Sequence, residues 1–339
     1  MHYAADMIAL VLLVALVAAG SLTASGTNIG INLGNVLEAP TEGAWAPVAQ
    51  QYYFDDYKAA GFTFVRVPVR WDEHTSKAPP FAIDAAFLAR VEEVVGWATA
   101  RNLSAIINSH HDDWIDSEIN YHTFKPRFLS IWTQVSAAFA GVPDSLLRFE
   151  VINEPVNLTI LQLNDMYASV VPIMRATNPT RAIYLGGLSW MSPYWVNSNP
   201  DAVVFPPLAS GAADPNLRLE MHSYDPYTFC LQNPPTASSW GTPADVAAVN
   251  TMYENAAAWQ TKHQRRVLMG EAGCQVAAPS RADRLLWYQT VGEAQKLLSD
   301  SLSVWDDFGE WKIYDRTKRT FDAGVLSALG LSAASISQA

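Results

Sequence analysis

The sequence contains few charged residues. Asp, Glu, Lys and Arg make up 16% of its 339 residues, and acidic residues outnumber basic ones, which gives a formal net charge of −11. This balance argues against nucleic acid or an anionic membrane surface as a partner, because both attract basic proteins. Half of the residues are apolar, so a sizeable core can form. The charge suits a neutral or cationic substrate but does not identify one.

Motifs of several enzyme and metal-binding classes are absent. The chain has no HExxH or CxxC spacing and no G-x-S-x-G sequence, which argues against a zinc enzyme and a serine hydrolase. The segment NSHHDDW does offer ligand types, at His110, His111, Asp112 and Asp113. Adjacent strand residues point to opposite faces, however, so His110 and His111 cannot readily bind one ion. We expect no metal and no cofactor.

Long hydrophobic runs are scarce as well. The uninterrupted apolar run Met7–Ala19 has 13 residues, which is short for a membrane span and typical of the core of a signal peptide. We expect residues 1–24 to be a signal peptide and the protein to be secreted or periplasmic. An uncleaved N-terminal membrane anchor is the alternative. No Gly/Ser-rich or Pro-rich linker divides residues 25–339, which we expect to form one domain.

Beyond this run, short apolar segments alternate with helical patterns. The segments are nearly continuous in apolar residues, as expected of parallel strands that are buried on both faces. The predicted strands are Ile29–Leu33, Thr63–Val69, Leu103–Asn108, Leu146–Ile152, Ala182–Leu185, Leu217–His222, Arg266–Met269 and Leu302–Trp305. The predicted helices are Ala49–Ala60, Asp84–Arg101, Pro126–Phe139, Gln162–Ala176, Pro243–His263 and Ser280–Leu298.

This alternation predicts the fold. Strands alternating with helices form right-handed βαβ units in a parallel sheet, and eight units in roughly 310 residues fit a closed (β/α)8 barrel in a single domain. An open doubly wound sheet is the alternative, but it usually has a Gly-rich phosphate loop after its first strand. The first strand here leads into NLGNVLEAPTEGAW, which is not such a loop. We therefore predict an α/β fold, a TIM barrel.

Two glutamates end predicted strands of this barrel. Glu154 follows the fourth strand and Glu271 ends the seventh, and such barrels carry their chemistry at the C-terminal ends of the strands. Two carboxyl groups that face each other across the barrel mouth are suited to glycoside hydrolysis, one as acid and one as nucleophile. Like charges at short range do not both ionise readily, so one carboxyl should keep its proton. The alternative is that each glutamate only caps a strand or pairs with an arginine.

Neighbouring residues fit the same chemistry. Arg66, at the end of the second strand, favours the ionised form of whichever carboxyl it approaches. Pro155 removes a backbone donor and ends the strand directly after Glu154. Large aromatic rings in loops can stack on the apolar faces of sugars. Tryptophans in or beside predicted loops are Trp45, Trp71, Trp114, Trp190, Trp195, Trp240 and Trp311.

Seven motifs occur in the order and spacing of glycoside hydrolase family 5, the cellulase-type barrels, which the chain resembles over essentially all of residues 25–339. The motifs are GINLGNVLEAPTEGAW, VRVPVRW, NSHHDD, VINEP, MHSYDPY, MGEAG and VWDDFGEWKIYD. The resemblance implies a (β/α)8 fold. It also implies a retaining mechanism with the two catalytic glutamates on strands four and seven.

The resemblance further implies roles for single residues. Glu154 matches the general acid/base and Glu271 the nucleophile. Asn153 matches the amide that holds the sugar 2-hydroxyl, whereas Arg66 and Tyr224 match groups that keep the nucleophile ionised and oriented. The other matches are histidines that contact the −1 sugar or support the acid/base (His110, His222 and, less closely, His111), the aromatic platform under the −1 sugar (Trp305) and contacts on the glycone side (Asn32, Glu38 and Trp190).

The two cysteines follow neighbouring predicted strands. Cys230 comes after the sixth strand and Cys274 after the seventh, so both lie on the same side of the barrel and a bridge is geometrically possible. An exported protein permits a disulfide. We expect Cys230 and Cys274 to be bridged if the protein is exported.

Together these observations predict a monomeric, retaining endo-β-1,4-glucanase that hydrolyses β-glucan polysaccharides or oligosaccharides. Alternatives within the resembled family are a β-mannanase, a mixed-linkage glucanase, a xyloglucanase and an exo-β-1,3-glucanase. The alternative from another class is a sugar-binding barrel without catalysis.

Overall fold

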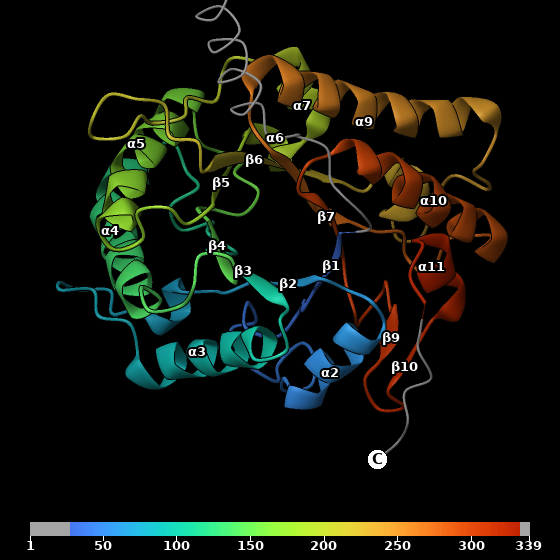
Figure 1. The fold of residues 1–339 in the computed structure, drawn as a ribbon, viewed down its shortest axis with the longest axis horizontal. Helices are drawn as coiled ribbons and strands as arrows, with labels where there is room; N and C mark the ends of the chain where they lie inside the picture. The colour runs from blue at the N-terminus through green and yellow to red at the C-terminus, as the bar shows by residue number, and fades with distance from the viewer. Residues whose placement is uncertain (1–27, 333–339) are drawn as a thin grey trace, which may run out of the picture.

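The computed structural model describes residues 28–332. Eight parallel strands form a closed barrel in the order of the sequence, from β1 to β8, and helices surround it (Figure 1). The strands are β1 (Ile29–Asn32), β2 (Phe64–Val67), β3 (Ser104–Asn108), β4 (Leu147–Glu150), β5 (Ile183–Gly186), β6 (Leu217–Ser223), β7 (Val267–Ala272) and β8 (Ser301–Val304). The predicted (β/α)8 barrel is confirmed.

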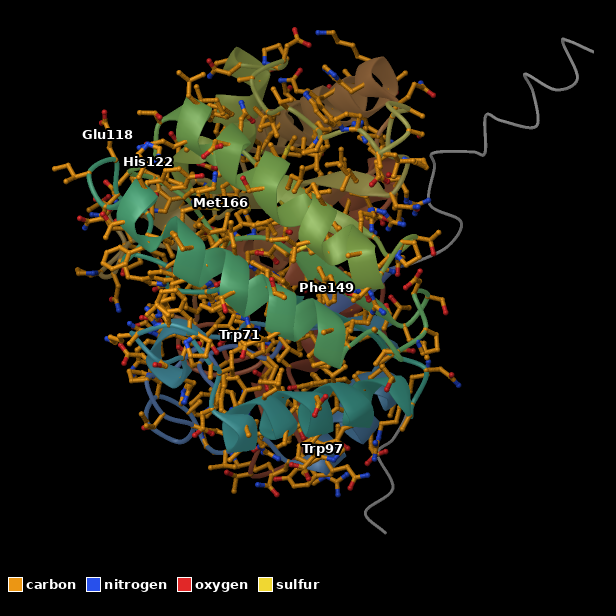
Figure 2. All side chains as sticks on the ribbon, turned by 90° about the vertical axis from the view of Figure 1, so that its left-hand side faces the viewer. Trp71, Trp97, Glu118, His122, Phe149 and Met166 are labelled. Atoms are coloured by element: carbon orange, nitrogen blue, oxygen red, sulfur yellow. A yellow bond between two sulfur atoms is a disulfide. The ribbon has the colours of Figure 1, made fainter. Side chains whose placement is uncertain are left out.

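Helices cover the outside of the barrel, and shorter ones lie in the loops at its mouth. They are α2 (Gln51–Ala59), α3 (Ala85–Thr99), α4 (Tyr121–Ala138), α5 (Ile160–Thr177), α6 (Leu188–Met191), α7 (Pro193–Ser198), α8 (Tyr227–Cys230), α9 (Pro243–His263), α10 (Arg281–Ala294) and α11 (Ala323–Ala328). Side chains cap several of them: Asp84 accepts from the N–H of Phe87 in α3, and Thr159 and Thr242 form capping boxes at α5 and α9. These caps satisfy N–H groups that a helix start leaves free. Figure 2 shows α4 and α5 packed side by side.

The strands are buried on both faces. Every residue of β1, β2, β3, β5, β7 and β8 is buried, as the nearly continuous apolar runs predict. The main core lies between the strands and the helices. Trp132 in this core pairs its polar atom, since Nε1 donates to the Val151 carbonyl at 3.0 Å, which suits a buried indole.

The barrel interior is layered. Phe64, Ile106, Tyr184 and Leu268 form an apolar cluster separate from the main core. Residues two positions further along a strand share its face, and several of these inward positions near the C-terminal ends are polar. The buried polar residues there are Asn32, Arg66, Asn108, Glu150, Glu220 and Ser303. A polar layer therefore lies between the apolar interior and the barrel mouth.

Helix α4 begins earlier than predicted. The predicted helix starts at Pro126, but α4 starts at Tyr121 and Pro126 lies inside it. The chain already turns before that point, since the N–H groups of Asn120 and Tyr121 both donate to the Ser117 carbonyl.

Several short elements were not predicted. They are α6, α7, α8, α11, the 3₁₀ turn η1 (Asp72–His74), and the antiparallel pair β9 (Tyr314–Asp315) and β10 (Thr320–Phe321). The predicted helix Ser280–Leu298 is α10 followed by the 3₁₀ turn η2 (Gln295–Leu297). The short elements are too brief for a periodic apolar pattern to reveal them.

The predicted signal peptide, residues 1–24, lies outside the described residues. Within residues 28–332, no helix has both the length and the apolar character that crossing a membrane requires.

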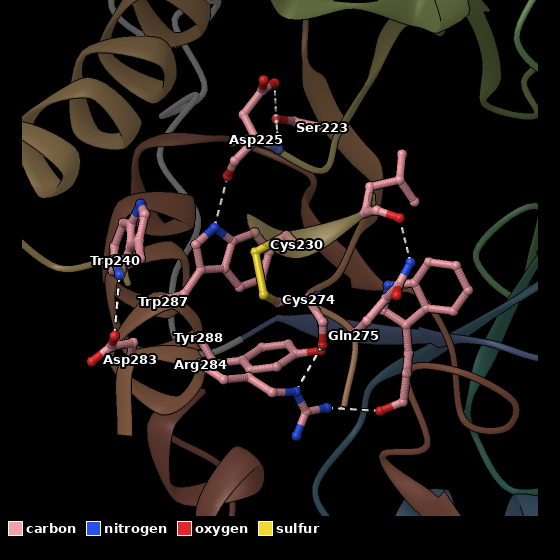
Figure 3. Close-up of a disulfide and its surroundings, with 12 residues drawn as sticks. Ser223, Asp225, Cys230, Trp240, Cys274, Gln275, Asp283, Arg284, Trp287 and Tyr288 are labelled. Atoms are coloured by element: carbon pink, nitrogen blue, oxygen red, sulfur yellow. Dashed lines mark hydrogen bonds between the residues drawn. A yellow bond between two sulfur atoms is a disulfide. The ribbon is translucent and has the colours of Figure 1, made fainter. Parts of the chain in front are cut away.

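Cys230 and Cys274 are joined by a disulfide between the end of α8 and the residues after β7 (Figure 3). Hydrogen bonds hold the same region: the Cys274 carbonyl accepts from Arg284 Nε at 2.8 Å and from the Tyr288 hydroxyl at 3.1 Å. The Gln275 N–H donates to the Cys230 carbonyl at 3.0 Å. The local structure therefore does not depend on the disulfide alone.

We predict that the double substitution C230A/C274A lowers the free energy of unfolding without preventing folding. The disulfide closes a loop with a sequence separation of 44, for which the chain-entropy model gives up to about 4 kcal/mol. Thermal unfolding with and without dithiothreitol measures this effect. The reductant should lower the Tm of the wild type and leave that of C230A/C274A unchanged. Equal Tm values for the wild type and C230A/C274A without reductant would contradict the prediction.

Candidate active site

Glu154 and Glu271 meet at the mouth of the barrel. Glu271 belongs to β7, and Glu154 lies four residues beyond the end of β4. One oxygen of Glu154, one oxygen of Glu271 and one ring nitrogen of His222 lie within 4.8 Å of one another. The side chain of Glu271 is 5% exposed and that of Glu154 is 26% exposed. Both carboxyl groups therefore face one small space, and Glu154 is the more exposed of the two.

The backbone of Glu154 is strained. Its φ is 48°, in the left-handed region, where an L-residue is strained. The following Pro155 favours an extended conformation at Glu154 and so disfavours this φ further. The chain on either side is fixed: the Asn153 N–H donates to the Ser109 carbonyl at 2.8 Å. After the proline, Asp116 accepts from the N–H groups at positions 156, 157 and 158. These bonds hold Glu154 in the conformation that turns it toward the cleft.

Arg66 uses all its N–H groups inside the barrel. Its Nε and Nη2 donate to the two oxygens of Glu150, each at 2.7 Å. Nη2 also donates to Asn153 Oδ1 at 2.7 Å, and Nη1 donates to Asn32 Oδ1 at 3.0 Å and to Glu271 Oε1 at 2.6 Å. Five donors in a rigid planar fork thus fix side chains from β1, β4 and β7 relative to one another.

Glu271 is held in its charged form. Burial alone would raise its pKa, but the charges of His222 and Arg66 and the hydrogen bond from Tyr224 outweigh burial and leave the pKa of Glu271 below its ordinary value. The Tyr224 hydroxyl donates to Oε2 at 2.6 Å, and Arg66 donates to Oε1. Both oxygens therefore accept a strong hydrogen bond, and the group is an ionised carboxylate fixed in orientation.

The pKa of Glu154 is shifted in the opposite direction. Burial and the nearby Glu271 carboxylate raise the pKa of Glu154, although its hydrogen bond with His222 opposes both. His222 Nδ1 lies 2.8 Å from Glu154 Oε1 and 3.8 Å from Glu271 Oε1. Burial would lower the pKa of His222, but Glu271, Glu154 and Glu220 raise it to about 10. The pair therefore combines one ionised carboxylate with one carboxyl that keeps its proton more readily.

An open cleft of about 710 Å³ lies over the pair. Aromatic residues form much of its lining: Trp190, Tyr224, Tyr227, Trp305 and Trp311. The rings of His110 and Trp305 are near parallel, at 10°, with centroids 6.0 Å apart. A cleft with aromatic walls around two carboxyl groups suits a chain of sugar rings, whose apolar faces stack on such side chains.

The two neighbouring histidines have different environments. Asn108 Nδ2 lies 3.0 Å from His110 Nδ1 and, as an N–H donor, makes that nitrogen the acceptor, so the ring hydrogen is on Nε2. Burial, with His111 and Arg66 nearby, holds the pKa of His110 well below its usual range, so it is neutral. His111 is partly exposed at the cleft edge, where its ring meets Trp45 edge-on at 5.3 Å.

Trp190 projects from an unusual turn. Its side chain is 60% exposed, and Ser189, Trp190 and Met191 have φ values of 57°, 59° and 55°. Three consecutive left-handed residues other than glycine are costly. Packing holds them, because a Cβ on Gly186 would lie 2.6 Å from the Met191 side chain. The glycine lets Met191 anchor the turn that presents Trp190 to the cleft.

The structure thus gathers most of the predicted site residues. Those in or against the cleft are Arg66, His110, His111, Asn153, Glu154, Trp190, His222, Tyr224, Glu271 and Trp305. Asn32 is a correction: it is fully buried, and Nδ2 donates to the Gly270 carbonyl at 3.0 Å and to Ser303 Oγ at 3.1 Å. Asn32 points into the barrel, so it supports Arg66 and cannot contact a sugar.

Glu38 also has its hydrogen-bond partners within the protein. Its carboxylate is buried and accepts hydrogen bonds from the N–H groups of Asn35 and Val36. Burial raises the pKa of Glu38 to about 7. In this structure Glu38 shapes the loop after β1.

Three functional side chains were not predicted. Glu150 and Glu220 pair with Arg66 and His222 inside the barrel, and Asp116 holds the loop after Pro155. For Glu150 and Glu220 the sequence did contain a signal, namely a carboxylate within the otherwise buried runs LRFE and LRLEMH. Charged residues are almost never fully buried unless paired, so each carboxylate implied a buried partner. For Asp116 no sequence signal exists, since its partners are backbone N–H groups of a distant loop.

Among residues 28–332, two sets of side chains have metal-ligating atoms close together: Glu154, His222 and Glu271, and Glu150, Glu220 and His222. In both sets the carboxylates already face positive charge. Arg66 donates to Glu150 and Glu271, and His222 faces Glu154 and Glu220. A cation would have to displace these donors, so the residues present do not fit a metal site well.

A closed (β/α)8 barrel with facing carboxyl groups at the C-terminal end of its strands is the architecture of many glycoside hydrolases. The family model described as cellulase, glycosyl hydrolase family 5, matches residues 22–307. The chain belongs to glycosyl hydrolase family 5.

Relatives and solved structures agree with this membership. The chain is 41% identical over 308 residues to Endoglucanase H of Acetivibrio thermocellus, a match that covers 89% of this chain and 32% of that protein. It is 31% identical to Endoglucanase B of Clostridium cellulovorans, over 72% of this chain and 58% of that protein. The chain thus spans about a third of the first of these relatives and less than two thirds of the second.

Among solved structures, Cel5A of Thermotoga maritima in complex with mannotriose is similar with a TM-score of 0.81 and 29% identity, over 89% of this chain and 97% of that one. A hyperthermophilic endo-β-1,4-glucanase in complex with substrate is similar with a TM-score of 0.80 and 32% identity, over 90% and 97% of the two chains.

We predict that Arg66→Met destabilises the fold strongly. The substitution leaves the buried Glu150 without its cation, and breaking a buried ion pair on one side costs about 3–5 kcal/mol. The double substitution R66M/E150Q removes the cation and one anion together and should cost less. Urea unfolding of the wild type, R66M, E150Q and R66M/E150Q measures the four free energies. If R66M were as stable as the wild type, Arg66 would not hold the network together.

Proposed function

We propose that this protein is an exported, retaining endo-β-1,4-glucanase that hydrolyses β-linked glucans. The observation that carries the proposal is the pair Glu154 and Glu271, with oxygens within 4.8 Å and pKa values shifted in opposite directions. Retaining glycosidases keep their two carboxyl groups about 5–5.5 Å apart, whereas inverting ones need about 6.5–9.5 Å to admit a water. The short separation supports retention.

Glucan as the substrate is supported by the relatives, which are named endoglucanases. A cleft open to solvent, with exposed Trp190 and Tyr227 beside the carboxyl pair, suits attack within a chain. Export is supported by the Cys230–Cys274 disulfide, because disulfides persist in oxidising compartments.

In the first step Glu271 is the nucleophile. Its ionised carboxylate attacks the anomeric carbon, and the bond from that carbon to the leaving-group oxygen breaks as Glu154 donates its proton to that oxygen. Arg66 and Tyr224 keep both oxygens of Glu271 oriented before the attack. Asn153 accepts from Arg66 through Oδ1, which leaves its amide hydrogens for the 2-hydroxyl of the sugar.

In the second step a water hydrolyses the glycosyl-enzyme. Glu154, now a carboxylate, takes a proton from the water, which attacks the anomeric carbon and releases Glu271. His222 supports both steps, because its N–H faces Glu154 Oε1 at 2.8 Å and stabilises the negative charge that alternates between the two glutamates. Two inversions leave the product with the original β configuration.

A second candidate is β-mannan hydrolysis. The observation that favours it is the similar Cel5A structure, which is described in complex with mannotriose. Mannose differs from glucose at the 2-hydroxyl, which is the group that Asn153 is placed to meet. A sugar-binding barrel without catalysis is disfavoured, because binding requires neither an ionised nucleophile nor a proton donor beside it.

We predict that Glu154→Gln and Glu271→Gln each lower kcat by several orders of magnitude while folding is largely retained. Reducing-sugar release from carboxymethylcellulose, barley glucan, mannan and xyloglucan measures the activity, and circular dichroism checks the fold. The control is Glu254→Gln, an exposed glutamate of α9, which should act like the wild type. Full activity in either active-site variant would refute the assignment, and the preferred polymer decides between glucanase and mannanase.

We also predict that the first product has the β configuration. A proton NMR time course with a cello-oligosaccharide should show the β-anomeric signal first and the α signal only as mutarotation proceeds. Retention requires two displacements by the same pair of carboxyl groups. If the α-anomer came first, Glu271 would not be the nucleophile.

A further inference from the structure

A third carboxylate lies directly beneath the catalytic pair. Glu220 is in β6, two residues before His222, and its side chain is fully buried in the barrel. Its Oε1 is 3.3 Å from His222 Nε2 and 3.5 Å from Arg66 Nε. Its Oε2 has no hydrogen-bond partner among residues 28–332. Packing does not explain this residue, because a buried, half-paired carboxylate costs stability that an apolar side chain of similar size would not.

The neighbouring strand is shaped to admit this carboxylate. Gly270 of β7 lies against it, and a Cβ on Gly270 would lie 1.7 Å from Glu220 Oε1. Any other residue at position 270 would therefore displace the Glu220 side chain. Because Gly270, directly before Glu271, has no side chain, it leaves room for Glu220.

The geometry of His222 shows what Glu220 does. Nδ1 faces Glu154 Oε1 at 2.8 Å, and Nε2 faces Glu220 Oε1 at 3.3 Å. A neutral imidazole has one N–H, so the ring can donate to both carboxylates only in its doubly protonated form. If only Nε2 carried hydrogen, Nδ1 would instead accept a hydrogen bond from the Glu154 carboxyl. The ring would then compete with the leaving group for the proton of Glu154.

We propose that Glu220 is a positioning residue of the reaction: it holds the proton of His222 Nε2, so that Nδ1 also stays protonated and donates to Glu154. The inference rests on the proposed function, in which Glu154 is the acid/base. Glu220 touches neither the substrate nor the reacting atoms, and it acts through His222.

The charged and titratable groups around this chain come from several strands. Those facing Glu220 or His222 are Arg66 of β2, Glu150 of β4, Glu154 after β4, Glu271 of β7 and, near His222, His110 after β3. Replacing Glu220 by glutamine removes one negative charge from this set. A nearby anion raises the pKa of a group, so removing the Glu220 charge lowers the pKa at which the protonated pair of Glu154 and His222 loses its first proton.

The test is the pH dependence of kcat/KM on the polymer that the wild type prefers. Glu220→Gln should move the alkaline limb down by roughly one pH unit, as expected for losing one charge at this range, and should lower kcat about tenfold. Glu220→Asp, which keeps the charge, should restore much of the alkaline limb. Asp300→Asn is the matched control, since Asp300 is a buried carboxylate at the start of β8 that pairs with Arg218 and Arg266. It should lower Tm and leave the pH profile unchanged.

Gly270 provides an independent test. Gly270→Ala should give the same alkaline shift as Glu220→Gln, because its Cβ pushes the carboxylate away. In a Glu220→Ala background the same glycine substitution should have little further effect, since the obstructed side chain is gone. Additive losses in the double variant would show that Gly270 does not serve Glu220.

A measurement without turnover completes the test. The ¹⁵N signals of the His222 ring, followed against pH, should show a lower pKa in Glu220→Gln than in the wild type. An unchanged His222 titration and an unchanged alkaline limb in Glu220→Gln, or an equal shift in Asp300→Asn, would overturn the proposal. Failure of the proposed function looks different: the wild type would then release no sugar, or Glu154→Gln and Glu271→Gln would stay active.

Discussion

The constraint on which this site depends is the burial of one arginine with all its donors in use. Arg66 is fully buried, and a buried guanidinium is tolerable only when each N–H finds an acceptor. Its acceptors come from β1, from β7 and from β4 with the residues that follow it. The need to satisfy one cation therefore sets the relative position of three parts of the barrel. Replacing such a network with apolar side chains is often neutral or stabilising, so its chemical use gives a better account of it than stability does.

Two glutamates that are identical in covalent structure differ here through their surroundings. Glu271 accepts hydrogen bonds on both oxygens and lies beside two cations, whereas Glu154 has one contact with a histidine and a strained backbone. Burial acts on both in the same direction, and the partners decide the difference. An unequal distribution of donors thus separates an ionised carboxylate from a carboxyl that keeps its proton more readily, within a few ångströms.

Much of this arrangement could be predicted from the sequence. Apolar runs marked all eight strands, and polar residues at their ends marked the mouth, because parallel strands end at a common edge. Asn32 was misplaced because a run of residues does not show at which level of the barrel a side chain turns inward. Glu150 and Glu220 were overlooked for the related reason that each lies within a run that otherwise indicates burial. Asp116 was beyond sequence reasoning, since its role depends on a contact between two loops that only the folded chain brings together.

That last contact has a consequence for how such barrels diversify. The segment that carries Glu154 is hydrogen-bonded to Asp116 of the preceding βα loop, so the two loops are held together although they are separate in the chain. Exchanging the β3–α4 loop with that of a relative would loosen Glu154 at the same time, because Asp116 would be lost with the loop. These two loops must therefore be transplanted together.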